Sequence, residues 1–249
     1  MCIDNKIYLT FDMDWACDEV MDFLYDLLEN YGLSATINIT NYFCNIGRYR
    51  DNKRINLGIH PNFNPIINGD AGGDNKEVVI RKCKELIPDA VVARSHSLLN
   101  STPLTKVLYE FGIKYELNSF IVPHKGMCVY PWYLEGVMQI PFFFEDDIYL
   151  MEGFSNQPKF YLCNRIKMYK IFNFHPIHLF LNTETLERYY KIKKDYHNFN
   201  VLKKNRNTKD YGILDFFKEL MKEASDGGYE FDLIRNIRKE DYSENCGDR

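Results

Sequence analysis

Strand-like and helix-like patterns alternate along almost the whole chain, and this alternation constrains the fold more than any other feature. Segment 6–11 is rich in β-branched and aromatic residues, as strands are. Apolar residues at helical spacing follow from Val20 to Tyr31, and Gly32 is placed to end that helix. Further strands are expected at 35–40, 55–59, 91–93, 113–117, 137–144, 171–174 and 229–233, and further helices at 76–87, 104–111 and 211–224. This order predicts an α/β fold with a mostly parallel sheet, either open or closed into a barrel.

No internal repeat and no Pro- or Gly-rich linker divides the chain, so we expect one domain over 1–249. Hydrophobic residues make up 45% and charged residues 27%, which is typical of a globular protein and excludes global disorder. The formal net charge of −4 argues against a dedicated nucleic-acid binder. The polar segment 240–249 is expected to be frayed.

Three features bear on the compartment of the protein. No stretch approaches the roughly 20 apolar residues that a membrane-spanning helix needs. The first residues run into a strand pattern without the apolar core of a signal peptide. The seven cysteines show no paired spacing, so most of them are expected to be free thiols. Together these features predict a cytoplasmic protein.

Polar side chains follow the predicted strands, where parallel α/β folds gather their functional groups. Asp12 and Asp14 end the first strand, and residues two apart share a face of an extended chain. Two adjacent carboxylates repel each other unless a cation separates them or one is protonated. The alternative is an acidic surface loop. Other strand ends carry His60, Arg94, His96, the acidic run 145–147, His175 and His178.

Four of the six histidines lie at these strand ends, which chance explains poorly, although a single histidine there is more often structural. An aspartate with two histidines is a familiar ligand set for a catalytic divalent metal with an open position for water. A second carboxylate could deprotonate that water, and a further histidine could protonate the leaving group. This inventory predicts metal-assisted hydrolysis of an amide or ester.

Several short sequences resemble the motifs of polysaccharide deacetylases, the NodB-homology enzymes of carbohydrate esterase family 4. They are Thr10-Phe11-Asp12-Met13-Asp14-Trp15, Gly58-Ile59-His60-Pro61-Asn62, Arg94-Ser95-His96 and Phe174-His175-Pro176. The segment 211–233 is similar to the usual end of that domain, so the resemblance spans almost the whole chain. It is nearest to the WbmS-like branch, which is associated with surface-polysaccharide biosynthesis. The resemblance implies an irregular (β/α) barrel of about seven strands.

The resemblance also implies catalytic roles. Asp12 would be the general base, and His175 would be the general acid at the leaving amine. Arg94 would orient the base. An acid in the run 145–147, with Asp146 favoured, would orient Arg94 in turn.

The metal site that the resemblance implies departs from the family pattern. Asp14 and His60 would be two ligands of a divalent metal, with zinc expected. The family usually has a second histidine four residues after the first, but Asn64 stands there, and an amide oxygen is a weak ligand for zinc. We expect His96 to be the third ligand. The alternatives are Asn64 itself or a site that has lost its metal.

These observations predict a metal-dependent hydrolase that removes an N-acyl group, acetyl in the first place, from a small-molecule or lipid-linked sugar. One alternative is hydrolysis of another non-peptide carbon–nitrogen bond on the same scaffold. The other is a degenerate sugar-binding module without turnover, which Asn64 keeps open. The basic segment 189–209 is either a solvated helix and loop or a clamp for a phosphate-bearing or acidic substrate.

Overall fold

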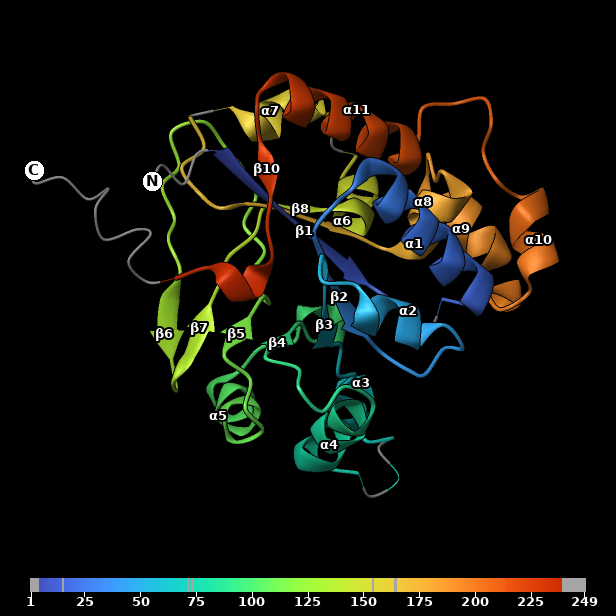
Figure 1. Ribbon diagram of the computed structural model, residues 1–249. Coiled ribbons are helices and arrows are strands. Elements are labelled where there is room, and N and C mark those ends of the chain that lie inside the picture. The colour runs from blue at the N-terminus through green and yellow to red at the C-terminus, as the bar shows by residue number, and fades with distance from the viewer. Residues whose placement is uncertain are drawn as a thin grey trace, which may run out of the picture.

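The computed structural model describes residues 5–14, 16–70, 72, 74–153, 155–163 and 165–238, and the segment 240–249 lies outside this range. The described strands join one strongly curled sheet with helices around it (Figure 1). The strands are β1 (Lys6–Asp12), β2 (Ala35–Ile39), β3 (Ile55–Ile59), β4 (Val92–Ala93), β5 (Tyr115–Glu116), β6 (Trp132–Leu134), β7 (Val137–Gln139), β8 (Phe144–Glu145), β9 (Lys170–Phe174) and β10 (Glu230–Phe231). The single-domain organisation stays a prediction.

The helices between the strands differ widely in length. They are α1 (Asp18–Tyr31), α2 (Ile46–Asp51), α3 (Asn64–Ile67), α4 (Lys76–Leu86), α5 (Thr102–Glu110), α6 (Asp146–Met151), α7 (Pro158–Leu162), α8 (Pro176–Leu181), α9 (Leu186–Ile192), α10 (Phe199–Lys204) and α11 (Ile213–Asp226). Gly32 ends α1 with φ 63°, and its N–H donates to the carbonyl oxygen of Glu29. Among the described residues, none of the helices is long and apolar enough to cross a membrane.

The sheet order is β6-β7-β5-β4-β3-β2-β1-β9-β8, with β10 beside the start of β1. All pairings are parallel except that of β6 with β7. The C-terminal ends of the parallel strands therefore open at one edge of the sheet, where the resemblance places the site. This arrangement confirms the expected α/β class and the mostly parallel sheet.

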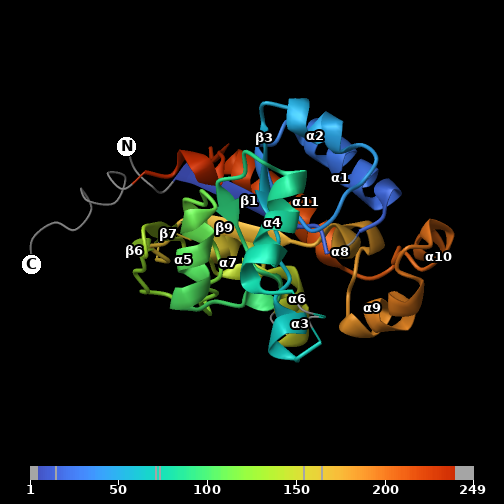
Figure 2. The ribbon, with the colours of Figure 1, turned by 90° about the horizontal axis from the view of Figure 1, so that it is seen from below.

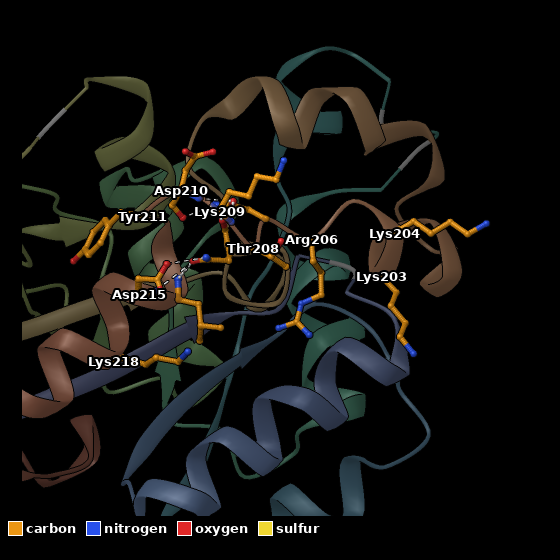
Figure 3. A pocket seen from close by; sticks show the side chains of 12 residues that line it. Lys203, Lys204, Arg206, Thr208, Lys209, Asp210, Tyr211, Asp215 and Lys218 are labelled. Atoms are coloured by element: carbon orange, nitrogen blue, oxygen red, sulfur yellow. Dashed lines mark hydrogen bonds between the residues drawn. The ribbon is translucent and has the colours of Figure 1, made fainter.

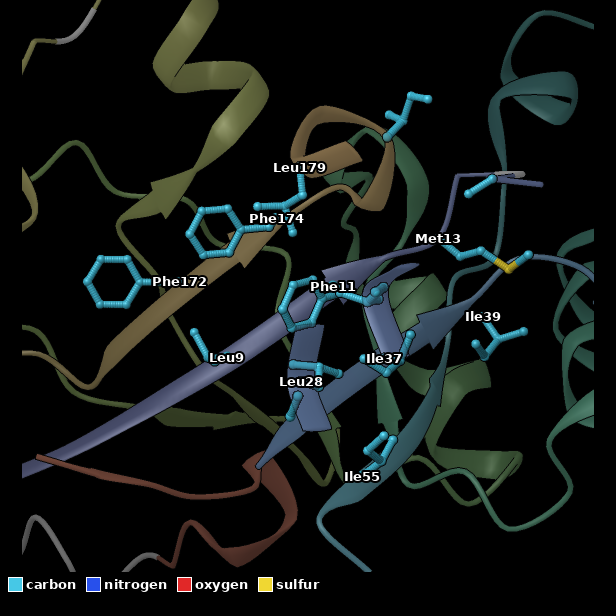
Figure 4. Close-up of a cluster of buried hydrophobic side chains, with 14 of the residues drawn as sticks. Leu9, Phe11, Met13, Leu28, Ile37, Ile39, Ile55, Phe172, Phe174 and Leu179 are labelled. Atoms are coloured by element: carbon cyan, nitrogen blue, oxygen red, sulfur yellow. The ribbon is translucent and has the colours of Figure 1, made fainter. Parts of the chain in front are cut away.

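Side chains of the central strands alternate between a core outside the sheet and its concave inner face. On β1, Leu9 and Phe11 join the large apolar cluster that packs against the helices, whereas Thr10 and Asp12 are buried and polar. Figure 4 shows the outer set, in which Phe11 lies among apolar residues of β2 and β9. The same alternation on β9 sends Asn173 inward, so the concave face carries the polar residues.

Residues 137–145 connect the two ends of the curl. They pair first with β5, through Met138 opposite Tyr115, and then with β9, through Phe144 opposite Phe172. Pro141 lies between the two pairings and has no N–H to donate to a ladder. The segment expected to be one strand is therefore two, β7 and β8. The sheet contains ten short described strands rather than about seven, and it is curled without being a regular barrel.

Candidate active site

Three of the predicted metal ligands meet at the C-terminal edge of the sheet. Asp14 follows β1 in a left-handed conformation with φ 44°, which aspartate tolerates better than most residues. Its Oδ1 lies 2.9 Å from Nε2 of His60, which follows β3, and 3.0 Å from Nδ1 of His96, which follows β4. Burial opposes ionisation of Asp14, but its contacts with the two histidines hold the pKa of this carboxyl well below its ordinary value.

The donor set of this cluster fits a divalent metal. The ligand atoms of Asp14, His60 and His96 all lie within 4.8 Å of one another. His60 is 2% exposed. Its ring nitrogens lie near carboxylate oxygens, but neither of them makes an aligned hydrogen bond among the described residues. A buried imidazole without such a partner is costly unless a metal ion takes its lone pair. One carboxylate and two imidazoles are also the donors that zinc and similar ions prefer.

Asn64 makes its side-chain hydrogen bond outside this cluster. It is the first residue of α3, and its side-chain amide donates to Oγ of Ser97 at 3.0 Å. Among the described His, Cys, Asp and Glu side chains, His96 is the residue that joins Asp14 and His60 in one candidate metal-ligand group. This geometry supports the predicted third ligand.

Asp12 is fixed beneath the cluster by side-chain amides. It is 1% exposed, and it accepts hydrogen bonds from Asn38 at 2.8 Å and from Asn173 at 2.8 Å. Its Oδ1 lies 3.6 Å from Nδ1 of His60, so the His60 ring stands between Asp12 and Asp14. Burial raises the pKa of Asp12, yet Arg94 and the neighbouring histidines outweigh burial and lower it overall.

Asn38 depends on the absence of a side chain on the next strand. Gly58 on β3 pairs with Asn38 on β2, and a Cβ at Gly58 would lie 2.5 Å from Oδ1 of Asn38. It would also lie 2.9 Å from the carbonyl oxygen of Val92. The glycine therefore leaves room for the Asn38 side chain on β2 to reach Asp12.

Arg94 contacts Asp12 as predicted, but Asp146 does not hold it. The guanidinium is fully buried; Nε donates to the carbonyl oxygen of Leu117 at 2.9 Å, and Nη1 donates to Thr10, Asn173 and Asp12. The Phe142 ring covers it at 4.4 Å. The expected pairing of Arg94 with Asp146 is therefore wrong, because α6 begins at Asp146 and turns its carboxylate toward another partner.

That partner is His175. Nδ1 of His175 lies 2.6 Å from Oδ1 of Asp146, and Nε2 lies 3.5 Å from Oδ2 of Asp14. Burial opposes protonation of His175, but the Asp146 carboxylate and its hydrogen bond outweigh burial and raise the pKa well above its ordinary value. His175 therefore faces the cluster through the nitrogen that Asp146 leaves free.

Two further ionisable groups complete the surroundings. His178 is buried, its Nδ1 lies 3.1 Å from Oγ1 of Thr183, and burial lowers its pKa. Glu145 is buried beside Asp12 and His175, and its Oε2 has no hydrogen-bond partner in the described part of the chain. Burial and the nearby Asp147 raise the pKa of Glu145 well above its ordinary value.

A side-chain network that the sequence motifs do not include fixes the loop with His96. Asn118 accepts a hydrogen bond from the Ser95 N–H at 2.8 Å, and its amide donates to Leu99 O at 3.3 Å and to Glu116 at 2.7 Å. Between Ser95 and Leu99, two residues other than glycine have positive φ: Ser97 at 58° and Leu98 at 53°. Asn118 therefore holds both ends of a strained loop that carries a candidate metal ligand.

A cavity of about 240 Å³ opens onto Asp14, His96 and His175. Its outer wall comes from α9 and the following turn, with Tyr189, Tyr190, Lys193 and Tyr196. The Tyr196 hydroxyl donates to the carbonyl oxygen of Asp14 at 2.6 Å, which connects this wall to the end of β1. The cavity is small and has aromatic walls next to the predicted metal ligands and the predicted general acid.

Comparison with known proteins identifies a family and several similar structures. The family model of WbmS-like polysaccharide deacetylases matches residues 9–193. A crystal structure from Bordetella bronchiseptica, of a protein assigned as a polysaccharide deacetylase involved in O-antigen biosynthesis, has a TM-score of 0.80 and 31% identity. That match covers 89% of this chain and 91% of the other. A comparison with curated proteins finds no match.

Two more distant structures were also found. A family 4 carbohydrate esterase from Streptomyces lividans, in complex with acetate, has 9% identity and a TM-score of 0.49, with 94% of each chain covered. A 4-alpha-glucanotransferase from Thermococcus litoralis has 13% identity and a TM-score of 0.52, over 94% of this chain and 40% of that one, which indicates a shared fold alone. The family model and the Bordetella structure carry the assignment: the chain belongs to the WbmS-like polysaccharide deacetylase family.

Proposed function

We propose that the protein is a metal-dependent hydrolase that removes an N-acyl group, acetyl in the first place, from a sugar used in surface-polysaccharide biosynthesis. The observation that carries this proposal is the position of Asp14. Its two carboxylate oxygens face the His60–His96 pair on one side and Nε2 of His175 on the other. A metal-ligand set and an acid therefore meet at one cavity, with Asp12 behind them.

Asp14, His60 and His96 would hold the cation, which would polarise the substrate carbonyl and lower the pKa of a water molecule. Asp12 accepts the proton as water attacks the acyl carbon. Asn38, Asn173 and Arg94 fix the direction of the Asp12 carboxylate, so it needs no reorganisation as it takes the proton.

His175 then donates the proton on Nε2 to the departing nitrogen as the carbon–nitrogen bond breaks, and acetate and a free amine result. Asp146 accepts the Nδ1 hydrogen bond, which fixes the tautomer and stabilises the protonated ring. The proposed substrates are nucleotide-linked or lipid-linked precursor sugars in the cytoplasm, and cell fractionation would check that location.

The test is acetate release from a panel of N-acetyl sugars by the zinc-loaded protein. Asp12→Asn and His175→Ala are expected to lower the rate by about 100-fold or more while zinc stays bound. Asp89→Asn, which changes an exposed aspartate, serves as the matched control. If zinc binds and no N-acetyl sugar is cleaved, the protein is not a sugar deacetylase. A sugar-binding module would bind the sugars and retain that binding in Asp12→Asn.

A further inference from the structure

A second, larger hollow lies at the other end of α8. His175 immediately precedes this six-residue helix and Asn182 follows it, so at 1.5 Å per residue roughly 9 Å of helix separates the two positions. Asn182 lines a pocket of about 870 Å³. The labelled residues of this pocket come from α10, the loop 205–212 and the start of α11 (Figure 3). The α9–α10 region lies beyond α8 at one end of the molecule in both ribbon views (Figures 1 and 2).

The lining of this pocket is strongly cationic, although the whole chain carries a net charge of −4. Its cationic side chains are Lys203, Lys204, Arg206, Lys209 and Lys218. None of them forms an ion pair with any described carboxylate. The two acidic side chains of the lining are Asp210 and Asp215, and Asp215 already accepts hydrogen bonds from Asn182 at 2.8 Å and from Gly212 N–H at 3.2 Å.

Hydrogen bonds of Asn207 and a close approach at Gly212 hold the floor of the pocket. Asn207 is buried, donates to the carbonyl oxygens of Asn182 and Asp210 at 3.0 and 2.7 Å, and accepts from the N–H groups of Lys209 and Asp210. Gly212 packs so closely on Asn182 that an added Cβ would lie 2.2 Å from its carbonyl oxygen. The loop that carries Arg206 and Lys209 is therefore fixed against α8 before any ligand binds.

Arg206 is oriented by aromatic rings rather than by an acid. Its guanidinium carbon lies 4.7 Å from the centre of the Phe180 ring and 5.4 Å from that of Phe23. Stacking leaves the planar N–H donors of an arginine available, and such donors match the oxygens of a phosphate group. Lysines around the rim add point charges that suit a ligand with more than one negative charge.

We propose that this pocket binds a diphosphate group and is a site separate from the hydrolytic cavity. The volume exceeds what one phosphate needs. Arg206, Lys209 and Lys218 form no ion pair with a described carboxylate and suit a group with several negative charges, whereas Lys203 and Lys204 extend away from them (Figure 3). The choice of a diphosphate over other polyanions rests on the proposed function, because nucleotide-linked and lipid-linked sugars both carry one. The basic segment singled out in the sequence contributes four of the five cations.

The test is calorimetric titration of the full chain with inorganic pyrophosphate and, separately, with a nucleoside diphosphate. The same titration of His60→Ala removes a metal ligand, and unchanged binding there would locate the ligand outside the hydrolytic cavity. The double variant Lys209→Ala/Lys218→Ala should bind about tenfold more weakly, with a smaller dependence of affinity on salt. Arg206→Lys keeps the charge and should still weaken binding, because the planar donors are lost.

The matched control is Lys191→Ala/Lys194→Ala, which removes two exposed lysines of the same basic segment outside the pocket. Equal losses in both double variants would show general attraction to a basic surface and overturn the proposal, as would the absence of saturable binding up to roughly 1 mM.

Vesicles of phosphatidylcholine with and without a polyprenyl diphosphate identify the source of the diphosphate group. Pocket-dependent binding of the vesicles supports a lipid carrier, and pocket-dependent binding of the nucleoside diphosphate supports a soluble one. Loss of acetate release with diphosphate binding intact would count against the hydrolytic function alone.

Discussion

His175 and Asp146 are joined twice. Nδ1 of the ring lies 2.6 Å from one oxygen of the Asp146 carboxylate, and the backbone N–H of His175 donates to the other at 2.8 Å. A single carboxylate therefore fixes both the ring and the backbone from which α8 begins.

Asp146→Asn should lower kcat for deacetylation by about 100-fold or more, because an amide neither stabilises the protonated ring nor enforces its tautomer. Zinc held by Asp14, His60 and His96 should stay bound, since Asp146 is not one of these three ligands. The control is Asp147→Asn, in which the neighbouring acid of the same run is changed. Equal losses in the two variants would contradict the role given to Asp146.

The third metal ligand can be decided by two variants. His96→Ala should weaken zinc binding by at least about 100-fold, because it removes one of three protein donors. Asn64→Ala should change the zinc affinity little, since that side chain contacts Ser97 instead. Competition titration with a zinc chelator measures both. A larger loss in Asn64→Ala than in His96→Ala would restore the alternative ligand.

Asn118→Ala should weaken zinc binding by about tenfold or more without removing a ligand, because the strained loop between Ser95 and Leu99 loses its clamp. Asn100→Ala offers a matched control, since that side chain makes only contacts of 3.5 Å with the same network. Unchanged zinc affinity in Asn118→Ala would show that the loop keeps its shape unaided.

Arg94→Ala should lower the free energy of unfolding by about 3–5 kcal/mol, because it leaves the buried Asp12 without its cation. Arg48→Ala removes exposed pairs with Asp22 and Asp26 and a contact with the Tyr25 ring, and it should cost about 1 kcal/mol or less. Urea unfolding of the two variants compares them directly. Similar losses in both would mean that the buried charge is compensated elsewhere.

Glu145 gives the stability a specific pH dependence. Burial, with Asp147 nearby, holds its pKa in the folded protein above the unfolded value of 4.5. Its contribution to stability is therefore complete below about pH 4.5 and is lost as the pH rises toward the folded-state pKa, by up to roughly 1.4 kcal/mol per pH unit. Glu145→Gln removes this dependence, so the free energy of unfolding of the variant should increase relative to that of the parent as the pH rises. A constant difference between the two unfolding free energies above about pH 4.5 would refute the role given to Glu145.

Long periodic elements could be predicted from the sequence, and short ones could not. The pattern from Val20 to Tyr31 located α1, since a buried stripe repeats over several turns there. By contrast, α8 has six residues, all buried, and its sequence therefore shows no polar face. The prediction of one strand over 137–144 was wrong because Pro141 has no N–H to donate to a neighbouring strand. The proline in the sequence already argued for a break there.

The motif residues of the site were predictable, and the residues that fix them mostly were not. Asn173 lies two residues before His175, at the end of β9. Residues two apart share one face of a strand, so this spacing could have identified Asn173 as a residue of the site. Asn38 lies opposite Asp12 in the pairing of β1 with β2, and Asn118 follows β5 beside the end of β4, so both contacts depend on which strands pair and in which register. Asp146 stood in a run of three acids, and only the start of α6 decides which partner it meets.

Gly58 has a consequence for any attempt to change the substrate range. It does not line the cavity that opens onto Asp14, so a library built from cavity residues alone would leave it free to vary by chance. Even an alanine there would collide with Asn38 and turn the amide that holds Asp12. Directed evolution should therefore keep this position constant, because a methyl group on β3 would misalign a carboxylate on β1 without touching any sugar.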